Sequence, residues 1–233
     1  MTENRWESIA DSLQSDSSTT LLGDRLVRVA GEIFESPSNS VTVWSMPLFL
    51  TFATSDDRAH LLDQQQLVCN QGPIFDAEEA DSPVYTPDVQ GPDCVERWPL
   101  FYPTLVENHV GSLLCFPMRA GSSHIGAVTS YRDVVGAPSP EMYRDGLILS
   151  LLATEAILHL KAGTTNDAYI ADFQYAIEND AVTQQAAGMV SEHFNVSIAD
   201  AMVLIRSRAF SGNYSLGGIS RAIVSRELLL EDW

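Results

Sequence analysis

The sequence predicts an α+β fold in which an antiparallel sheet flanked by helices is followed by an all-α unit of three helices. The first observation is a pair of strand-like segments, GSLLCFPMR and HIGAVTSYRD, that flank the turn AGSS and predict an antiparallel hairpin. The second is the helical pattern of Pro138–Leu160, directly after the hairpin. The third is the end of the chain, which combines short helical segments with a fixed pattern of small and basic residues.

Two amphipathic helices are expected at the start of the chain, over Arg5–Leu13 and Thr20–Phe34. The segments VTVWSM and LFLTFAT that follow them predict two strands. Pro47 lies between these strands and indicates an edge or a bend, because proline cannot donate to a strand ladder. Arg58–Val68 then predicts a helix that ends near a cluster of breaker residues.

The middle of the chain predicts short elements. GPIFDAEEADSPVYTPDV combines a short helix with a brief extended piece, and RWPLFYPTLVENH indicates an aromatic-rich surface helix or loop. The apolar positions of Pro138–Leu160 are too dense for one narrow stripe. We therefore expect this helix to pack on the sheet with one side and on another helix with the other.

The last segments predict three helices that depend on one another. Asp167–His193 predicts a long helix, whose front half is expected to pair with a second copy of the chain in a homodimer. Ser197 and Asp200 give a capping-box-like start to the next helix, and Ser215 is placed to cap a third. Helices of this length are not stable alone, so the three must share one small core.

The composition is that of an ordinary soluble protein. The chain of 233 residues is 45% hydrophobic and can bury a sizeable core, yet no apolar run reaches the roughly 18 residues that cross a bilayer. Cys69, Cys94 and Cys115 lack disulfide or zinc spacing, and the histidines lack metal-ligand spacing. No phosphate loop, nucleophile elbow or pair of catalytic acids is evident. We expect a cytoplasmic protein with no catalytic residue, metal, cofactor or membrane partner.

The net charge of −18 opposes a simple nucleic-acid-binding function, because Lys and Arg supply most non-specific affinity for phosphate. The charge is unevenly distributed. Residues up to Asp172 carry 9 basic against 24 acidic side chains, a net −15, whereas the chain from Phe173 carries 4 against 7, a net −3. Any RNA contact would rest on a few placed arginines and on shape, with a low tolerance for salt.

The segment Thr183–Leu230 resembles the ANTAR domain, a three-helix RNA-binding unit of bacterial transcription antiterminators. The matching residues are the A-x-G-M run that ends at Met189, the A-x-x-L-x-R-x-x-A run over Ala201–Ala209, and Leu216. The resemblance covers about a quarter of the chain. It implies binding to stem-loops in the leader of a nascent mRNA, so that a terminator hairpin cannot form.

The part before it resembles a GAF domain, a small-molecule sensor fold. The resemblance rests on GPIFDA at Gly72–Ala77, on Trp98-Pro99, on the run SLLCFPMRAGSSHIGAVTSYRD and on the acidic helix after Ser139. GAF domains that precede ANTAR domains in actinobacterial proteins look like this. Together the two resemblances divide the chain into a sensor domain (1–162), a linker or hinge helix (163–172) and an RNA-binding domain (173–233).

Gly188 lies inside a helix, where glycine costs about 1 kcal/mol relative to alanine. Either an RNA loop approaches this bare surface, or another helix crosses it closely. Arginine suits phosphate forks and stacking on splayed bases, although each arginine here could equally lie on a solvated helix face. With the resemblance, the candidate RNA-binding residues are Gln185, Ala186, Gly188, Arg206, Arg208, Ala209 and Arg221.

Two departures from the ANTAR pattern leave an alternative open. Many ANTAR domains carry a lysine where this chain has Ala187, and the third helix opens with Gly217-Gly218, where helix formers are usual. These departures imply a weaker RNA affinity or a domain that orders on binding. A dimerising protein-interaction module with a degenerate RNA-binding domain is therefore the alternative function, and a helix-turn-helix DNA-binding factor is disfavoured by the acidic charge.

The GAF resemblance places a possible small-molecule ligand, of unknown identity, between the sheet and the variable middle of the chain. The alternative is that the aromatic residues there simply fill the core, as large aromatics mostly do. The candidate ligand-binding residues are Trp44, Phe49, Phe75, Trp98 and Tyr131.

Overall fold

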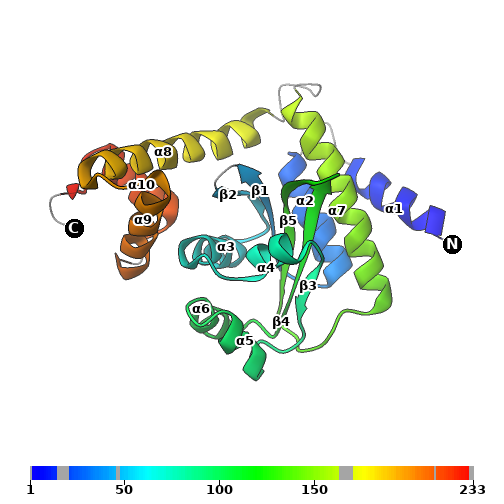
Figure 1. Ribbon diagram of the computed structural model, residues 1–233. Helices are drawn as coiled ribbons and strands as arrows, with labels where there is room; N and C mark the ends of the chain where they lie inside the picture. Colours follow the sequence, from blue (N-terminus) through cyan, green and yellow to red (C-terminus); the bar gives the residue numbers. More distant parts are fainter. Residues whose placement is uncertain (1, 15–20, 46–47, 163–169, 213, 231–233) are drawn as a thin grey trace.

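The computed structural model describes residues 2–14, 21–45, 48–162, 170–212 and 214–230 (Figure 1). Its centre is an antiparallel sheet of five strands in the order β2-β1-β5-β4-β3. The strands are β1 (Ser38–Ser45), β2 (Leu48–Thr54), β3 (Val84–Thr86), β4 (Ser112–Ala120) and β5 (Ser123–Arg132). We call residues 2–162 the sheet region and residues 170–230 the C-terminal bundle.

The expected hairpin is confirmed as β4 and β5, which pair from Ser112 opposite Arg132 to Ala120 opposite Ser123. The turn is shorter than the sequence indicates. Only two residues, Gly121 and Ser122, separate the end of β4 from the start of β5. In the middle of β5 the chain needs Gly126, since a Cβ there would lie 1.9 Å from the carbonyl oxygen of Thr42 on β1. The glycine therefore lets two strand backbones approach beside the bulge in β5, where Ile125 has no partner in the register with β4.

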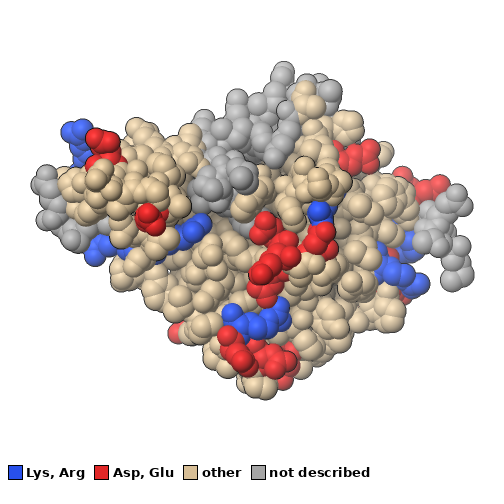
Figure 2. All heavy atoms as spheres, viewed as in Figure 1, with Lys and Arg blue, Asp and Glu red and all other residues tan. Residues whose placement is uncertain are grey.

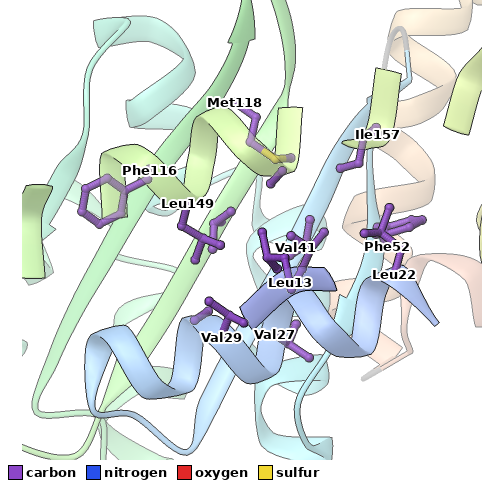
Figure 3. Close-up of a cluster of buried hydrophobic side chains, with 14 of the residues drawn as sticks. Leu13, Leu22, Val27, Val29, Val41, Phe52, Phe116, Met118, Leu149 and Ile157 are labelled. Carbon is purple, nitrogen blue, oxygen red and sulfur yellow. The ribbon is translucent and has the colours of Figure 1, made fainter. Parts of the chain in front are cut away.

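One face of the sheet is covered by α2 (Leu22–Phe34) and α7 (Pro140–Lys161), and α1 (Thr2–Gln14) packs against these two helices. Residues of β4 alternate between the faces, so that Phe116 and Met118 lie in this core while Cys115 lies in the opposite one. Figure 3 shows the converging side chains of this core, which include Leu13, Leu22, Val27, Val29, Val41, Phe52, Phe116, Met118, Leu149 and Ile157.

The long helix after the hairpin packs on both sheet and helices, as expected, but not with every apolar residue. Helix α7 begins after Ser139, whose side chain accepts a hydrogen bond from the Met142 amide, and it contacts β4, β5, α1 and α2. Three of its leucines are exposed instead. They are Leu147, Leu151 and Leu158.

The other face of the sheet is covered by α3 (Asp57–Cys69), α4 (Pro73–Ala80), α5 (Pro92–Arg97) and α6 (Tyr102–Glu107). The segment from Arg97 to His109 was expected at the surface, and this expectation is wrong for its large aromatics. Trp98 and Phe101 are almost completely buried, with ring centroids 6.5 Å apart. Prolines start both short helices, so the chain turns twice and directs these rings inward.

The C-terminal bundle consists of α8 (Ile170–Phe194), α9 (Ile198–Gly212) and α10 (Leu216–Val224), which share one core. The expected caps are confirmed, since Ser197 Oγ accepts from the Asp200 amide and Ser215 Oγ accepts from the Gly218 amide at 3.0 Å. A Cβ at Gly218 would lie 2.9 Å from Ser215 Oγ, so a glycine there suits this cap. Residues 163–169 of the expected hinge lie outside the described residues, as do the side chains of the expected dimer seam at the start of α8.

Candidate functional site

The surface around Gly188 is open. A Cβ added to this glycine would meet nothing within 4 Å apart from its own helix backbone, so no other helix of the described chain crosses it closely. Gln185, one turn earlier on α8, is exposed. The tight-crossing explanation of Gly188 is therefore wrong, and a ligand can reach the helix here.

Two of the expected RNA contacts are contradicted by burial. Ala186 and Ala209 have no exposed surface, because both lie in the core shared by α8, α9 and α10. Ala187 is buried in the same core. The position where many ANTAR domains carry a lysine thus faces the inside of this bundle, and its alanine fills the core instead of leaving a gap in a basic surface.

The arginines of α9 do not form a single patch. Arg206 and Arg208 are two residues apart, so they project to different sides of the helix. Arg206 follows the buried Met202 by one turn, and its Nε is buried without a hydrogen-bond partner in the described structure. This burial lowers the pKa of the Arg206 guanidinium. Arg221 is exposed on α10.

A hollow of about 260 Å³ lies on the other side of α9, between this helix and the end of α8. Its lining residues are Phe194, Leu204, Ser207, Arg208 and Ser211, which we call the Phe194 groove. Phe194 retains 37% of its surface and has an edge contact with His193, with ring centroids 4.8 Å apart. Phe194 is not among the site residues predicted from the sequence. The sequence pattern that could have indicated it is an aromatic residue just before the break between two helices.

Charge is distributed differently over the two parts of the molecule. On the face shown in Figure 2, acidic side chains gather mainly over the sheet region, while the C-terminal bundle carries both basic and acidic side chains. This distribution agrees with the division of charge in the sequence, and it leaves the bundle the less repulsive part for an anionic ligand.

Helix α3 joins the two parts of the molecule. Val68 is 3% exposed and belongs to the core of the C-terminal bundle, with Ala186, Ile205 and Ile219 among its members. Contacts of α3 with α9 and α10, and of β2 with α8, extend this interface. Figure 1 shows the bundle beside α3 at one end of the sheet region.

The opposite side of α3 contributes to a buried polar network. Asp63 is fully buried, and it accepts hydrogen bonds from Ser40 Oγ at 2.6 Å, Tyr131 Oη at 2.9 Å and Thr51 Oγ1 at 3.1 Å. Burial is the largest cause that raises the pKa of Asp63, and these hydrogen bonds oppose it. Tyr131 Oη in turn accepts from Gln66 Nε2 at 2.5 Å. The network therefore connects α3 to three strands of the sheet.

Backbone geometry holds Gln66 in this network. Its Oε1 accepts from the Ile74 amide at 3.2 Å, at the start of α4. The chain passes so close that a Cβ on Gly72 would lie 2.3 Å from Gln66 Oε1, and Gly72 also has a φ of +129°. Only glycine suits this position, which explains the glycine in the GPIFDA motif.

The expected ligand-binding aromatics divide into two groups. Trp98 and Tyr131 are completely enclosed by the apolar cluster between α3, α5, α6 and the sheet, so core filling is the correct explanation of their position. Trp44 and Phe75 are partly exposed and pack against the smaller cluster around Cys115. The side chain of Phe49 lies outside the described part of the structure.

The cysteines have the properties of structural residues. Burial raises the pKa of Cys69 and Cys94 to about 11 and that of Cys115 to about 12. Thiols with these values are poor nucleophiles near neutral pH. Among the residues that the structure describes, no three His, Cys, Asp or Glu side chains are grouped to hold a metal ion, and no helix is long and apolar enough to span a membrane.

Comparison with solved structures identifies the fold that surrounds the polar network. The GAF domain of a phosphoenolpyruvate-protein phosphotransferase from Coxiella burnetii matches 70% of this chain and 96% of its own, with a TM-score of 0.53 and 15% identity. The corresponding GAF domain from Acinetobacter matches 70% and 97%, with a TM-score of 0.52 and 14% identity. The sheet with its covering helices therefore has the GAF-domain fold.

No protein-family model matches the chain, and no curated protein matches its sequence.

Proposed function

We propose that the chain is a signal-responsive RNA-binding regulator that acts by transcription antitermination. In this proposal the sheet region senses a small molecule or another signal, and the C-terminal bundle binds a stem-loop in a nascent mRNA as part of a homodimer. No covalent step is involved. The observation that carries the proposal is the open, side-chain-free surface at Gly188, beside the exposed Gln185, on a helix with an ANTAR-like sequence.

The position of α3 provides a route for gating. One side of this helix holds Asp63 and Gln66 in the polar network of the sheet region, and the other places Val68 in the bundle core. A ligand that shifts the network would move α3, and packed cores respond to such shifts by changing between discrete arrangements. Because α3 also contacts α9 and α10, such a movement would reach the helices of the bundle directly.

Binding of the purified protein to hairpin RNAs, with duplex DNA of the same sequence as competitor, tests the proposal. We expect a preference for RNA that weakens steeply between low and moderate salt, because few arginines must neutralise phosphates. Arg206→Ala should reduce the affinity about tenfold or more, as expected when a charge-assisted hydrogen bond is removed. Arg144→Ala is the matched control, since it removes one exposed positive charge from α7.

A second candidate function is a dimerising interaction module without RNA affinity. The observation that favours it is the exposed row of Leu147, Leu151 and Leu158 on α7, which is typical of a surface that meets another protein. An absence of RNA preference at every salt concentration, together with a dimer that Leu151→Lys dissociates, would support this function in place of the first.

A further inference from the structure

The Phe194 groove has the chemistry of a site for one nucleobase. Its aromatic ring is accessible at the end of α8, and the partly buried Leu204 contributes a second apolar surface from α9. Bases that are splayed out of RNA loops stack on such aromatic side chains. The volume of about 260 Å³ lies below the roughly 300–1,000 Å³ of sites for drug-sized molecules, so the groove suits a single ring system.

Arg208 gives the groove a positive charge. In the described structure no carboxylate lies within 4.0 Å of its guanidinium, whereas Arg5, Arg58 and Arg97 in the sheet region are each paired with an aspartate. An unpaired guanidinium at the edge of a groove can form bidentate hydrogen bonds to a phosphate or stack on a base. Ser207 adds a hydroxyl group that can donate to or accept from a base edge, and Ser211 Oγ, which donates to the Arg208 carbonyl at 3.2 Å, can accept from one.

We propose that the Phe194 groove binds one unstacked base of a single-stranded RNA segment, with the base on Phe194 and a neighbouring phosphate on Arg208. This assignment rests on the proposed RNA-binding function. It adds a second RNA contact, which lies on a different side of α9 from Arg206. A peptide would also use apolar surface, but a short hollow with an unpaired arginine and two hydroxyls fits a nucleotide better than an extended chain.

The test uses the full chain and a hairpin RNA selected from a pool with a randomised loop. Phe194→Ala should weaken binding by about 5- to 150-fold, the equivalent of the roughly 1–3 kcal/mol per stacked base, whereas Phe194→Tyr should retain most of the affinity. Phe210→Ala is the matched control, because Phe210 is an exposed aromatic residue on α9 that does not line the groove. Arg208→Ala should weaken binding and reduce its salt dependence.

A fluorescent 2-aminopurine placed in turn at each loop position gives a second readout. At one position we expect its emission to fall on binding to the wild-type chain and to be restored with Phe194→Ala. Equal affinities of Phe194→Ala and Phe210→Ala, with normal binding by the wild type, would overturn the groove assignment and leave the proposed function standing. If the wild type binds no hairpin, both proposals are wrong. If Phe194→Ala alters only self-association in sedimentation, the groove binds polypeptide and the nucleotide assignment fails.

Discussion

Asp63 and Val68 are five residues apart on α3 and lie in two different cores. Asp63 accepts a hydrogen bond from Tyr131 inside the sheet region, whereas Val68 packs among the helices of the C-terminal bundle. The helix therefore belongs to both parts of the molecule, and a displacement of α3 would change the packing of both cores.

The first prediction concerns this shared helix. Val68→Asp would bury an unpaired carboxylate in the bundle core, which is strongly unfavourable. We expect faster amide hydrogen exchange in α9 and α10, measured by mass spectrometry, with smaller changes in β4 and β5. The control is Leu61→Asp on the same helix, where the side chain is 44% exposed. Equal exchange in the two variants would mean that α3 does not support the bundle.

The second prediction compares two helical glycines. Gly188→Ala should stabilise the protein by about 1 kcal/mol, because the added methyl group meets open space and alanine has the higher helix propensity. Gly146→Ala should instead destabilise it by about 1–3 kcal/mol, since a Cβ there would lie 2.4 Å from the Phe116 ring. Urea unfolding measures both. A destabilising Gly188→Ala would show that the surface is covered in solution.

The third prediction concerns pH. Burial raises the pKa of Asp63 in the folded state, so the folded protein holds this proton more tightly than the unfolded chain does. Between the unfolded pKa of about 4 and the raised folded pKa, the contribution of Asp63 to stability falls as pH rises. The stability of Asp63→Asn relative to wild type should therefore increase with pH above about 4 in urea unfolding. Asp57→Asn, which removes an exposed carboxylate from the same helix, is the control for the loss of one negative charge.

The fourth prediction concerns the thiols. Cys94 and Cys115 are fully buried and Cys69 is partly exposed. In the native protein we expect a disulfide reagent to label Cys69 slowly at neutral pH, because burial raises the pKa of its thiol to about 11, and to leave the other two unlabelled. All three should react in denaturant. Rapid native labelling of Cys115 would contradict the buried position of β4.

Local sequence patterns predicted most of the helices and strands, but they predicted little about which residues of these elements are buried. The caps at Ser197 and Ser215 and the hairpin of β4 and β5 follow from short-range rules, because each depends on residues close together in the chain. The candidate site was predicted less well. Ala186 and Gly188 are two residues apart, so they lie on different sides of α8, but only the packing of the helices decides that the Ala186 side is buried and the Gly188 side open.

By itself the sequence determined the α+β class, the order of helices and strands and the division of charge, since periodicity and composition are properties of the chain. Only the tertiary structure decided that Val68 completes the core of the bundle, that Trp98 and Tyr131 fill the sheet region, and that Phe194 borders a groove with Arg208. These facts depend on which surfaces meet. Whether a given residue is buried depends on contacts with side chains that are distant in the sequence, and a local sequence pattern does not predict these contacts.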